Sequence, residues 1–487
     1  MNQYRNLLQV LPNEPQIHDH LAEPRQPYQC LTERHLQAMW LEQKYFKHLS
    51  TVSGIPITIL SPGIWNSEAG PDFLKAHISI GGQELRGDIE LHLSEESWYY
   101  HQHHKDARYD QVVLHVSFWP ENKIRPILTS NGRSIERTVL RPHLTVPEAK
   151  LVKLIDLDLY PYQHFVGSGQ CAGHLFSKLS EEKIRSLFQS AALWRLNQKR
   201  SLLSEKSHCG DILPVGIAMA LGYKHNSEIF VEVYHRLKAL KIQNESILFA
   251  HALGMCGYFE DSYRKKWGDS TYYNTLANIY TESPSSQAIS RVNLRLDRIR
   301  PANHPIRRLA VLVKVCLDDH LDRLVQNISC LWNSLWSVND KKKWKLLLKQ
   351  LLEMLDCYRD EYWESHYTFE TSPQKNTIAL IGEGLKREIL INVCLPILYG
   401  EIEQRHDRFE KLAFEQFYAT LPALKAKKTT YLTHRFFGDH ASKLLFSQAD
   451  LQQGAYQIHK DFCLHFEASC IGCPFVERYQ RGQLCEQ

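Results

Sequence analysis

The run from Gly87 to Leu93 restricts the fold of this chain more than any other stretch, because its polar and apolar residues alternate strictly. Successive side chains of a β-strand point to opposite faces of a sheet, so strict alternation predicts a strand with two chemically different faces. One face carries the apolar side chains of Ile89, Leu91 and Leu93. The opposite face carries two carboxylates and an imidazole, from Asp88, Glu90 and His92. This polar face is the first candidate for a functional site.

Two more strands are expected beside this one, and together they predict a small α/β core. Ala76–Ile80 alternates in the same way, and Gly81-Gly82 supplies a turn because glycine reaches positive φ without a steric clash. The run from Gln111 to Phe118 alternates as a third strand. An amphipathic helix is predicted to begin after Thr32, which is a suitable N-cap residue.

The polar face of the central strand favours a bound cation. Carboxylates that share one strand face repel each other, and a divalent cation is a common way to offset that repulsion. Hard cations such as Mg²⁺ and Mn²⁺ take one or two protein carboxylates together with water and phosphate oxygens. Asp72, which follows Pro71 just before the first strand, adds another carboxylate. The alternative interpretation is a half-exposed antiparallel sheet, whose outer face is polar without forming any site.

The order of Pro71-Asp72, a hairpin, and Glu90-x-His92 on the next strand resembles the PD-(D/E)xK nuclease superfamily. In that superfamily the aspartate and the second acid hold a metal ion, and a lysine two residues later positions or activates water. The resemblance therefore implies that Asp72 and Glu90 are metal ligands and catalytic residues. His92 stands where the superfamily has lysine. Its imidazole is suited either to accept a proton from water or to be a third metal ligand.

The segment Trp98–Asp110 is rich in groups that bind metals or phosphates. We interpret it either as a loop that faces the substrate or as an additional metal site formed by His101, His104, Asp106 and Asp110. The alternative is a surface loop fixed by its aromatic residues, in which the histidines make ordinary hydrogen bonds. The residues expected to contact a substrate are His101, His104, Asp110, His115 and Arg300.

From about residue 175 the pattern repeats every three and four residues, which predicts a large all-helical region. Beyond a first helix, the expected segments are residues 213–222, 226–241, 244–258, 305–317, 321–337, 341–357, 376–402 and 407–420. Clusters of arginine and lysine within residues 195–200, 291–308 and 341–349 are suited to a phosphate backbone. Such clusters are also typical of solvated helix faces.

Cysteines near the C-terminus form a second candidate site. Three of them are spaced C-x6-C-x2-C, namely Cys463, Cys470 and Cys473. Four thiolates suit a tetrahedral Zn²⁺ ion or an iron–sulfur cluster. The first three spacings resemble the iron–sulfur loop of endonuclease-III-type DNA glycosylases, in which the fourth cysteine comes sooner. The candidates for the fourth ligand are Cys485, His459 and His465. The alternative is a tail of free thiols.

Composition is that of an ordinary globular chain. The 487 residues suffice for two or three domains, and the net charge of +4 permits a phosphate-rich partner without requiring one. No apolar run has the length of a signal-peptide core or a membrane span, so we expect a cytoplasmic protein without membrane association. The cysteines outside the C-terminal group are expected to be buried thiols in a reducing compartment.

Several segments together resemble a bacterial domain-of-unknown-function family: SPGIWNSEAGPDF, GDIELH, SWYYHQHHKDARYDQVVLHV, RIRPANHPIRRLA, SHYTF and LINVCLPILYG. The resemblance extends from about residue 35 to the C-terminal cysteines, and it implies that these segments belong to one unit. It carries no assigned activity. The family has Gly-Asn-Val-Glu-Ile-His where this chain has the segment that begins at Gly87. The resemblance therefore implies that Glu90, rather than Asp88, is the essential ligand.

These observations predict an α+β, mostly α chain with four parts. The parts are a loosely ordered extension over residues 1–30, a restriction-endonuclease-like α/β core over 31–165, an all-helical domain over 166–455, and a cysteine metal-binding tail over 456–487. The expected function is a metal-dependent nuclease that hydrolyses phosphodiester bonds in DNA or RNA, with Mg²⁺ or Mn²⁺ at Asp72 and Glu90. One alternative is a non-catalytic nucleic-acid-binding or scaffold protein with a structural metal tail. Another, from the cysteine spacing alone, is a DNA-glycosylase-like enzyme.

Overall fold

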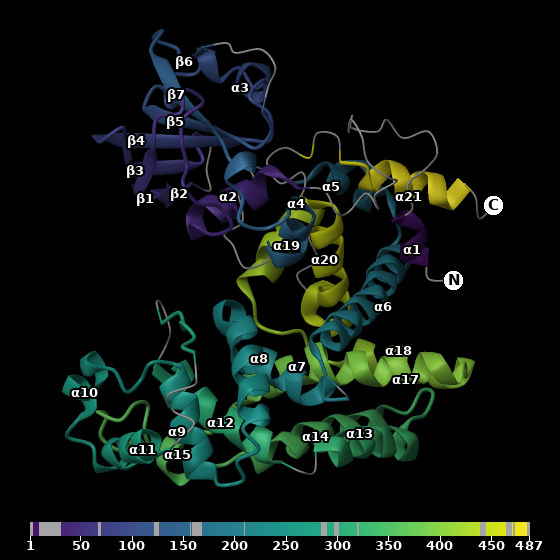
Figure 1. Ribbon diagram of the computed structural model, residues 1–487. Helices are drawn as coiled ribbons and strands as arrows, with labels where there is room; N and C mark the ends of the chain where they lie inside the picture. The colour runs from purple at the N-terminus through teal and green to yellow at the C-terminus, as the bar shows by residue number, and fades with distance from the viewer. Residues whose placement is uncertain are drawn as a thin grey trace. The chain divides into compact units, whose positions relative to one another are not determined.

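A computed structural model gives the fold of the chain (Figure 1). The described residues are 3–8, 31–66, 70–120, 126–155, 157, 168–208, 210–283, 290–296, 301–318, 321–438, 445–463, 470 and 473–484. The chain is α+β and mostly α, with 60% helix and one mixed sheet near the N-terminus. The predicted fold class is confirmed.

Two compact units divide the chain. Unit 1 comprises residues 1–184, 430–442 and 456–487, and unit 2 comprises residues 185–429 and 443–455. Unit 1 thus groups with the sheet residues 166–184 and 430–442, which were predicted in the all-helical domain, and residues 456–487, which were predicted as the tail.

The sheet of unit 1 has seven strands in the order β1-β3-β4-β5-β7-β6, with β2 paired to β3. Their bounds are β1 (Ile57–Ser61), β2 (Ile64–Trp65), β3 (Phe73–Ile80), β4 (Gln83–His92), β5 (Val112–Ser117), β6 (Ile127–Leu128) and β7 (Ser134–Val139). Strand β3 runs antiparallel to β1 and β4, whereas β5 runs parallel to β4 and β7. The three predicted strands correspond to β3, β4 and β5, and the predicted turn has positive φ at Gly81 and Gly82.

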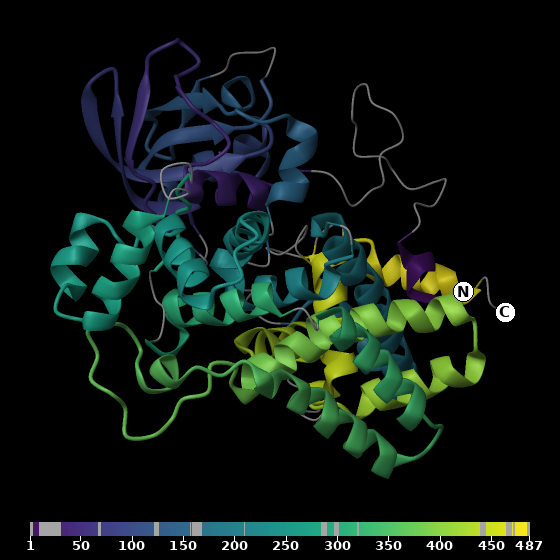
Figure 2. The ribbon, with the colours of Figure 1, turned by 60° about the horizontal axis from the view of Figure 1, so that its bottom comes forward.

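Helix α2 (Glu33–Glu42) begins after Thr32, as predicted, and packs against the strands of unit 1 (Figure 2). Side chains from the helix and from β4 share one buried cluster, which includes Leu36, Met39, Trp40, Ile89 and Leu91. The apolar face predicted for β4 is therefore the face that forms the core of the sheet.

A crossover connection joins β4 to the parallel strand β5 and covers the polar face of β4. It contains the short helix α3 (Ser97–Tyr100) and two 3₁₀ turns, η1 (His103–Lys105) and η2 (Ala107–Tyr109). Trp98 and Tyr109 of this connection are buried together with Val112. Glu90 and His92 are consequently only 5% and 1% exposed. Both faces of β4 are covered at these positions, unlike in a half-exposed sheet.

The other helices of unit 1 bring the two ends of the described chain together. Helices that lie wholly or partly in this unit are α1 (Gln3–Leu7), α4 (Glu148–Leu154), α5 (Gln170–His174), the first turn of α6 (Glu181–Lys206), α19 (Lys427–Phe437), α20 (Ala449–Asp461) and α21 (Phe475–Leu484). Tyr4 of α1 is fully buried and its hydroxyl donates to Asp461 Oδ2 at 2.9 Å. Arg478 of α21 donates to the carbonyl of Leu7 at 3.1 Å. Residues 3–7 of the predicted loosely ordered extension are therefore a packed helix, and residues 9–30 lie outside the described residues.

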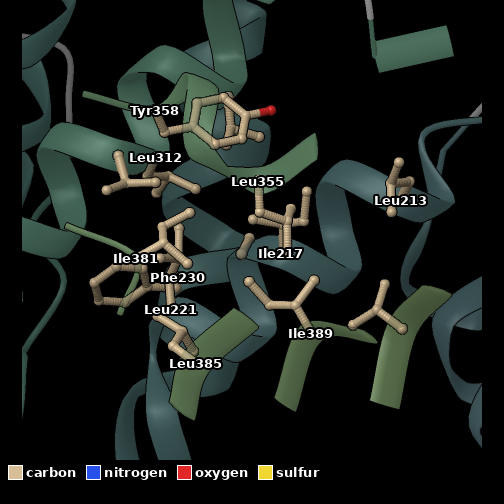
Figure 3. Packing of buried hydrophobic residues seen from close by; sticks show 14 of the residues in the cluster. Leu213, Ile217, Leu221, Phe230, Leu312, Leu355, Tyr358, Ile381, Leu385 and Ile389 are labelled. Carbon is tan, nitrogen blue, oxygen red and sulfur yellow. The ribbon is translucent and has the colours of Figure 1, made fainter. Parts of the chain in front are cut away.

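Unit 2 is built from helices. They are α6 (Glu181–Lys206), α7 (Ile212–Leu221), α8 (Tyr223–Ala239), α9 (Glu245–Met255), α10 (Asp261–Trp267), α11 (Thr271–Glu282), α12 (Pro305–Leu317), α13 (Leu321–Leu335), α14 (Lys341–Glu353), α15 (Glu361–Ser365), α16 (Glu383–Ile389), α17 (Leu395–Arg405) and α18 (Arg408–Thr420). Side chains of α7, α8, α12 and α16 point toward one another in Figure 3, among them Ile217, Phe230, Leu312 and Ile389. In the parts of the chain that the structure describes, no helix combines the length and the apolar character needed to cross a membrane.

Each predicted helical segment of unit 2 contains an observed helix, although α10, α11 and α15 have no counterpart in the prediction. In the segment predicted as residues 376–402, helix begins only at Glu383, and it continues as α16, a π-helical turn (Leu390–Cys394) and α17. Pro396 explains the turn. In a regular α-helix its ring clashes with the carbonyl four residues earlier, and the wider π turn accommodates it.

Part of the predicted basic surface is structural. Arg307 and Arg308 are buried in α12, and they donate to backbone carbonyls that include those of Trp363 and Leu380. A buried guanidinium that satisfies carbonyl groups has no free face for a phosphate, so these two arginines do not belong to a nucleic-acid surface. Arg300 lies outside the described residues.

Candidate metal centre

Asp72 and Glu90 lie next to each other where β3 begins beside β4. Phe73 pairs with Ile89 in the antiparallel register, which sets the preceding Asp72 opposite Glu90. The backbone N–H of Asp72 donates to Glu90 Oε2 at 3.0 Å, and Asp72 Oδ2 accepts the N–H of Leu91 at 2.9 Å. The two carboxylates singled out in the sequence are therefore neighbours on adjacent strands.

Helix α2 adds two polar side chains to this pair. Gln37 Nε2 donates to Asp72 Oδ1 at 2.5 Å, so both oxygens of Asp72 accept hydrogen bonds. Glu33, in the first turn of α2, accepts a backbone hydrogen bond from Leu93. It also lies close enough to Asp72 and Glu90 to repel their negative charges. Three acidic side chains thus converge at one end of β4.

Two histidines lie beside the other oxygen of Glu90, and a third histidine adjoins them. Glu90 Oε1 lies 3.4 Å from His92 Nε2 and 3.3 Å from His103 Nε2. His101 Nδ1 is 3.2 Å from His92 Nε2. One ring nitrogen from each histidine lies within 4.8 Å of the other two, a spacing suited to one shared ion. His92 and His103 are buried and His101 is exposed, so the group can be reached from solvent at His101.

A reversal of the backbone at Gln102 brings both His101 and His103 against the ring of His92. Gln102 adopts the left-handed conformation, with φ of 61°, between α3 and η1. The ring of His103 stacks on Tyr109, with centroids 3.8 Å apart, and contacts Trp98 edge to face. These aromatic contacts fix the orientation of the His103 imidazole.

Burial controls the ionisation of the acidic side chains. It raises the pKa of Asp72 well above its usual range, and repulsion from Glu90 and Glu33 raises that pKa further. Burial and the charge of Glu33 likewise raise the pKa of Glu90 well above its usual range. Burial raises the pKa of Glu33 to about 7. Three neighbouring carboxyl groups ionise together only when a cation offsets their repulsion, so a divalent ion would favour their charged forms.

Burial has the opposite effect on the histidines. It lowers the pKa of His92 well below its usual range, and it lowers the pKa of His103 to about 4. Burial is also the first cause of the lowered pKa of His101. The rings are consequently neutral at pH 7, and their nitrogen lone pairs can accept a metal ion or a proton.

His115 supports His92 from strand β5. Its Nε2 lies 2.9 Å from His92 Nδ1, while His92 Nε2 faces Glu90 and His101. A histidine whose second ring nitrogen is held in this way presents the first in a fixed orientation. His115 itself is fully buried, so its contact is with His92 rather than with a substrate in solvent.

Other residues predicted from the crossover lie outside this group. Asp110 accepts hydrogen bonds from the N–H and the hydroxyl of Ser130, and Asp106 pairs with Arg108. Asp106 therefore stabilises a local turn, whereas Asp110 links the end of the crossover to the loop before β7. Among these described residues, the additional metal site predicted from His101, His104, Asp106 and Asp110 is not assembled.

The C-terminal cysteines meet in unit 1. Cys463, Cys470 and Cys473 line one small pocket, and a fourth thiol reaches the same pocket from Cys171 of α5. Of the predicted fourth ligands, Cys485 and His465 lie outside the described residues, and the buried His459 is not among the residues that line the pocket.

Four residues of these two sites are missing from the sequence prediction: Glu33, Gln37, His103 and Cys171. Glu33 and Gln37 are four residues apart and thus share one helix face, which was a usable signal. His103 lies in the histidine-rich segment, although nothing there ranks it above His104. No local pattern connects Cys171 to the distant C-terminal cysteines.

The comparisons with curated proteins and with solved structures gave no match. The family described as "Protein of unknown function (DUF2851)" matches residues 33–427, which include α2, the whole sheet and most of unit 2. The match ends before the C-terminal cysteines, to which the predicted resemblance was expected to extend. It contains every residue of the acidic and histidine group. Because the matched residues make up well over half of the chain, the protein belongs to this family of proteins of unknown function.

Proposed function

We propose that this protein is a metal-dependent nuclease whose ion is held by Glu90, His92, His101 and His103, with Asp72 beside it. One observation carries the proposal: Glu90 Oε1 faces two imidazole nitrogens at 3.3 and 3.4 Å, and a third imidazole adjoins them. Neutral imidazoles together with carboxylates form a donor set for transition ions, whereas Mg²⁺ prefers oxygen ligands. The histidines therefore favour Mn²⁺ over Mg²⁺.

The proposed reaction is hydrolysis of a phosphodiester bond. A water oxygen forms a bond to phosphorus while the bond from phosphorus to the departing ester oxygen breaks. The water gives its proton to solvent, and the departing oxygen takes a proton from solvent. A bound ion lowers the pKa of the water and offsets charge on the phosphate. His101 is the exposed imidazole of the group, so solvent reaches the proposed ion from its side.

The resemblance to PD-(D/E)xK nucleases supports the proposal at two positions. Asp72 directly precedes β3, and Glu90 lies beside it on β4, which is where the resemblance puts the two metal ligands. His92 takes the place of the lysine of that superfamily. Its Nε2 faces Glu90 Oε1 and His101 Nδ1, so a role as metal ligand fits its position better than a role as base.

The crossover that carries His101 also carries positive charge. Lys105 and Arg108 belong to the same crossover and are exposed, although Arg108 is paired with Asp106. Positive side chains near a metal-bound phosphate attract a polyanion and hold it in place. Lys105 is consequently the residue of the crossover that we expect to contact the nucleic-acid backbone.

Glu90→Gln tests the proposal with little change in shape. The amide keeps an oxygen that accepts the N–H of Asp72, but it removes the charge that holds a cation. We expect Mn²⁺-stimulated cleavage of labelled DNA and RNA, single- and double-stranded, to be lost. Calorimetry should show Mn²⁺ binding weakened by roughly tenfold or more. Thermal stability without metal should not fall, because burial already disfavours the ionised carboxylate.

Asp88→Asn is the matched control on the same strand. Asp88 Oδ1 accepts the N–H of Lys75 at 3.0 Å and is not part of the histidine group, so this variant should keep both cleavage and Mn²⁺ binding. Wild-type protein that binds Mn²⁺ but cleaves none of these nucleic acids would refute the nuclease proposal. Binding of nucleic acid without cleavage and without Mn²⁺ would instead favour a nucleic-acid-binding or scaffold protein.

A further inference from the structure

Four cysteine side chains from separate parts of unit 1 line one pocket: Cys171, Cys463, Cys470 and Cys473. All four are free thiols. The first three are between 6% and 8% exposed, and Cys473 is partly exposed. The rest of the lining is mainly apolar and includes Phe462 and Phe475, whose ring centroids are 4.9 Å apart.

The backbone is shaped to bring these thiols together. The N–H of Gly169 donates to the carbonyl of Arg435 at 2.7 Å, and a Cβ atom at Gly169 would lie 2.9 Å from that oxygen. Only glycine therefore permits this approach of α5 to α19, which brings Cys171 to the pocket. On the tail, Cys470 has a φ of 58°, and its carbonyl accepts the N–H of Cys473 at 3.2 Å. This tight turn sets two thiols side by side, although it holds Cys470 in the left-handed conformation, which is strained for residues other than glycine.

Charge in the pocket favours deprotonated sulfur only in the presence of a cation. Burial is the main cause that raises the pKa of Cys171 to about 12, and repulsion from the neighbouring Cys470 and Cys473 adds to it. Burial also raises the pKa of Cys473 to about 11 and that of Cys463 well above its usual range. Without metal these three thiols therefore keep their protons. The buried Arg435 donates from Nη2 to Cys470 Sγ at 3.3 Å, which sets a charged donor beside the pocket.

We propose that Cys171, Cys463, Cys470 and Cys473 together bind an iron–sulfur cluster. Each sulfur loses its proton to solvent as it forms a bond to an iron atom of a cluster built from iron and sulfide. Cys171 is then the fourth ligand, in place of the candidates predicted from the tail: Cys485, His459 and His465. The proposal does not depend on the nuclease activity, because it involves none of the residues of the Glu90 site.

The spacing of the thiols favours a cluster over a single zinc ion. Tetrahedral Zn²⁺, with Zn–S bonds of about 2.3 Å, requires sulfur atoms about 3.8 Å apart. Among the residues that the structure describes, no three of the four sulfur atoms lie within 4.8 Å of one another. A polynuclear cluster spreads its ligands over a wider site than one ion does. Pro474 directly follows Cys473, as in the Cys-Pro ending of a bacterial iron–sulfur motif.

The proposed cluster is a structural link within unit 1. It would join Cys171 of α5 to Cys463, which follows α20, and to Cys470 and Cys473, which precede α21. Arg435 of α19 donates to one of these ligands, Cys470. Helix α21 starts two residues after Cys473, and its Arg478 holds the carbonyl of Leu7 in α1. Loss of the cluster is therefore expected to loosen α21 and α1 together.

Metal and sulfide analysis of the full chain, purified without oxygen, tests the proposal. We expect about four iron and four acid-labile sulfide per chain, with a broad visible absorption that a chelator removes. Cys171→Ser should lose most of the iron and sulfide. Cys330→Ser, which changes an exposed thiol of α13, is the matched control and should retain both.

Thiol labelling of the wild-type protein tests the ligand set even if Cys171→Ser does not fold. Exposed Cys330 and Cys357 should react with an alkylating reagent at once. The four pocket thiols should react only after a chelator has removed the iron, and Cys171 should then react in the same phase as the three tail cysteines.

Three results would overturn the proposal. One zinc per chain without sulfide would exclude the cluster. Full iron in Cys171→Ser, together with loss of iron in Cys485→Ser, would exclude Cys171 as the fourth ligand. Wild-type protein with neither metal would exclude both the cluster and the ligand set, and would leave four buried thiols.

Discussion

Glu33→Gln should make the metal-free protein more stable at alkaline pH, although it removes a residue of the acidic group. Glu33 lies in the first turn of α2, and burial raises its pKa from 4.5 to about 7. Glutamine keeps an oxygen that accepts the N–H of Leu93, and it carries no charge to repel Asp72 or Glu90. The substitution therefore isolates the energetic effect of one buried carboxylate.

The size of the effect follows from the two pKa values. Below about pH 4 the carboxyl group is protonated in the folded and the unfolded chain, so it contributes nothing to the pH dependence. As the pH rises from 4.5 toward 7 the unfolded chain ionises first, which favours unfolding. Above pH 7 the loss of stability is complete, and at about 1.4 kcal/mol for each pH unit it amounts to about 3 kcal/mol. Glu33→Gln should recover that amount at about pH 8 and nothing near pH 4.

Equilibrium urea unfolding in the presence of a chelator, at several pH values, measures this difference. Hydrogen exchange of α2 and β4 assigns the gain to the sheet of unit 1. Glu136→Gln, which changes an exposed glutamate of β7, is the control and should shift stability by less than about 0.5 kcal/mol at every pH. A gain that is the same at pH 4 and pH 8, or no gain at all, would show that Glu33 is solvated and would refute the argument.

Two further predictions concern the ion and the core of unit 2. Mn²⁺ affinity should rise by up to about tenfold per pH unit between about pH 5 and pH 8. The reason is that the carboxyl groups with raised pKa must lose protons before they bind the ion, whereas the histidines are already neutral. Calorimetry that finds no pH dependence of the affinity would contradict this. Gly216→Ala should lower the stability of unit 2 by about 1–3 kcal/mol, because the new methyl group would meet Val393 of the π-helical turn. Gly384→Ala, which has nothing within 4 Å, is its control, and equal denaturation midpoints for the two variants would contradict the prediction.

Much of the fold was predictable because it follows local periodicity. Strand β4 alternates strictly, and the helices of unit 2 repeat apolar residues every three or four positions, so each pattern identified its element. Helices α10 and α15, with seven and five residues, are too short to show such a period. The packing of the tail, residues 456–487, was not predicted for another reason. Its helices share a unit with residues that are hundreds of positions away in the sequence, and no local pattern records that.

The candidate site divides in the same way. Asp72 and Glu90 were found because a hairpin relates them by simple register. His103 was not, because the reversal at Gln102 decides which histidine of the crossover reaches Glu90. The role of Glu33 depends on how α2 packs over the strands, which its amphipathic pattern indicates only in outline. Site residues that only tertiary contacts bring together could therefore not be predicted from the sequence.

The division of unit 1 also bears on the order in which a ribosome delivers its parts. Residues 57–139, which hold all seven strands, are synthesised early. Residues 185–429, the main segment of unit 2, come next as one continuous stretch. The hydrogen bonds from Tyr4 to Asp461 and from Arg478 to Leu7 can form only after the C-terminal residues have been synthesised. Helix α1 therefore cannot take its place in unit 1 until partners 457 and 471 residues further along the chain have been synthesised.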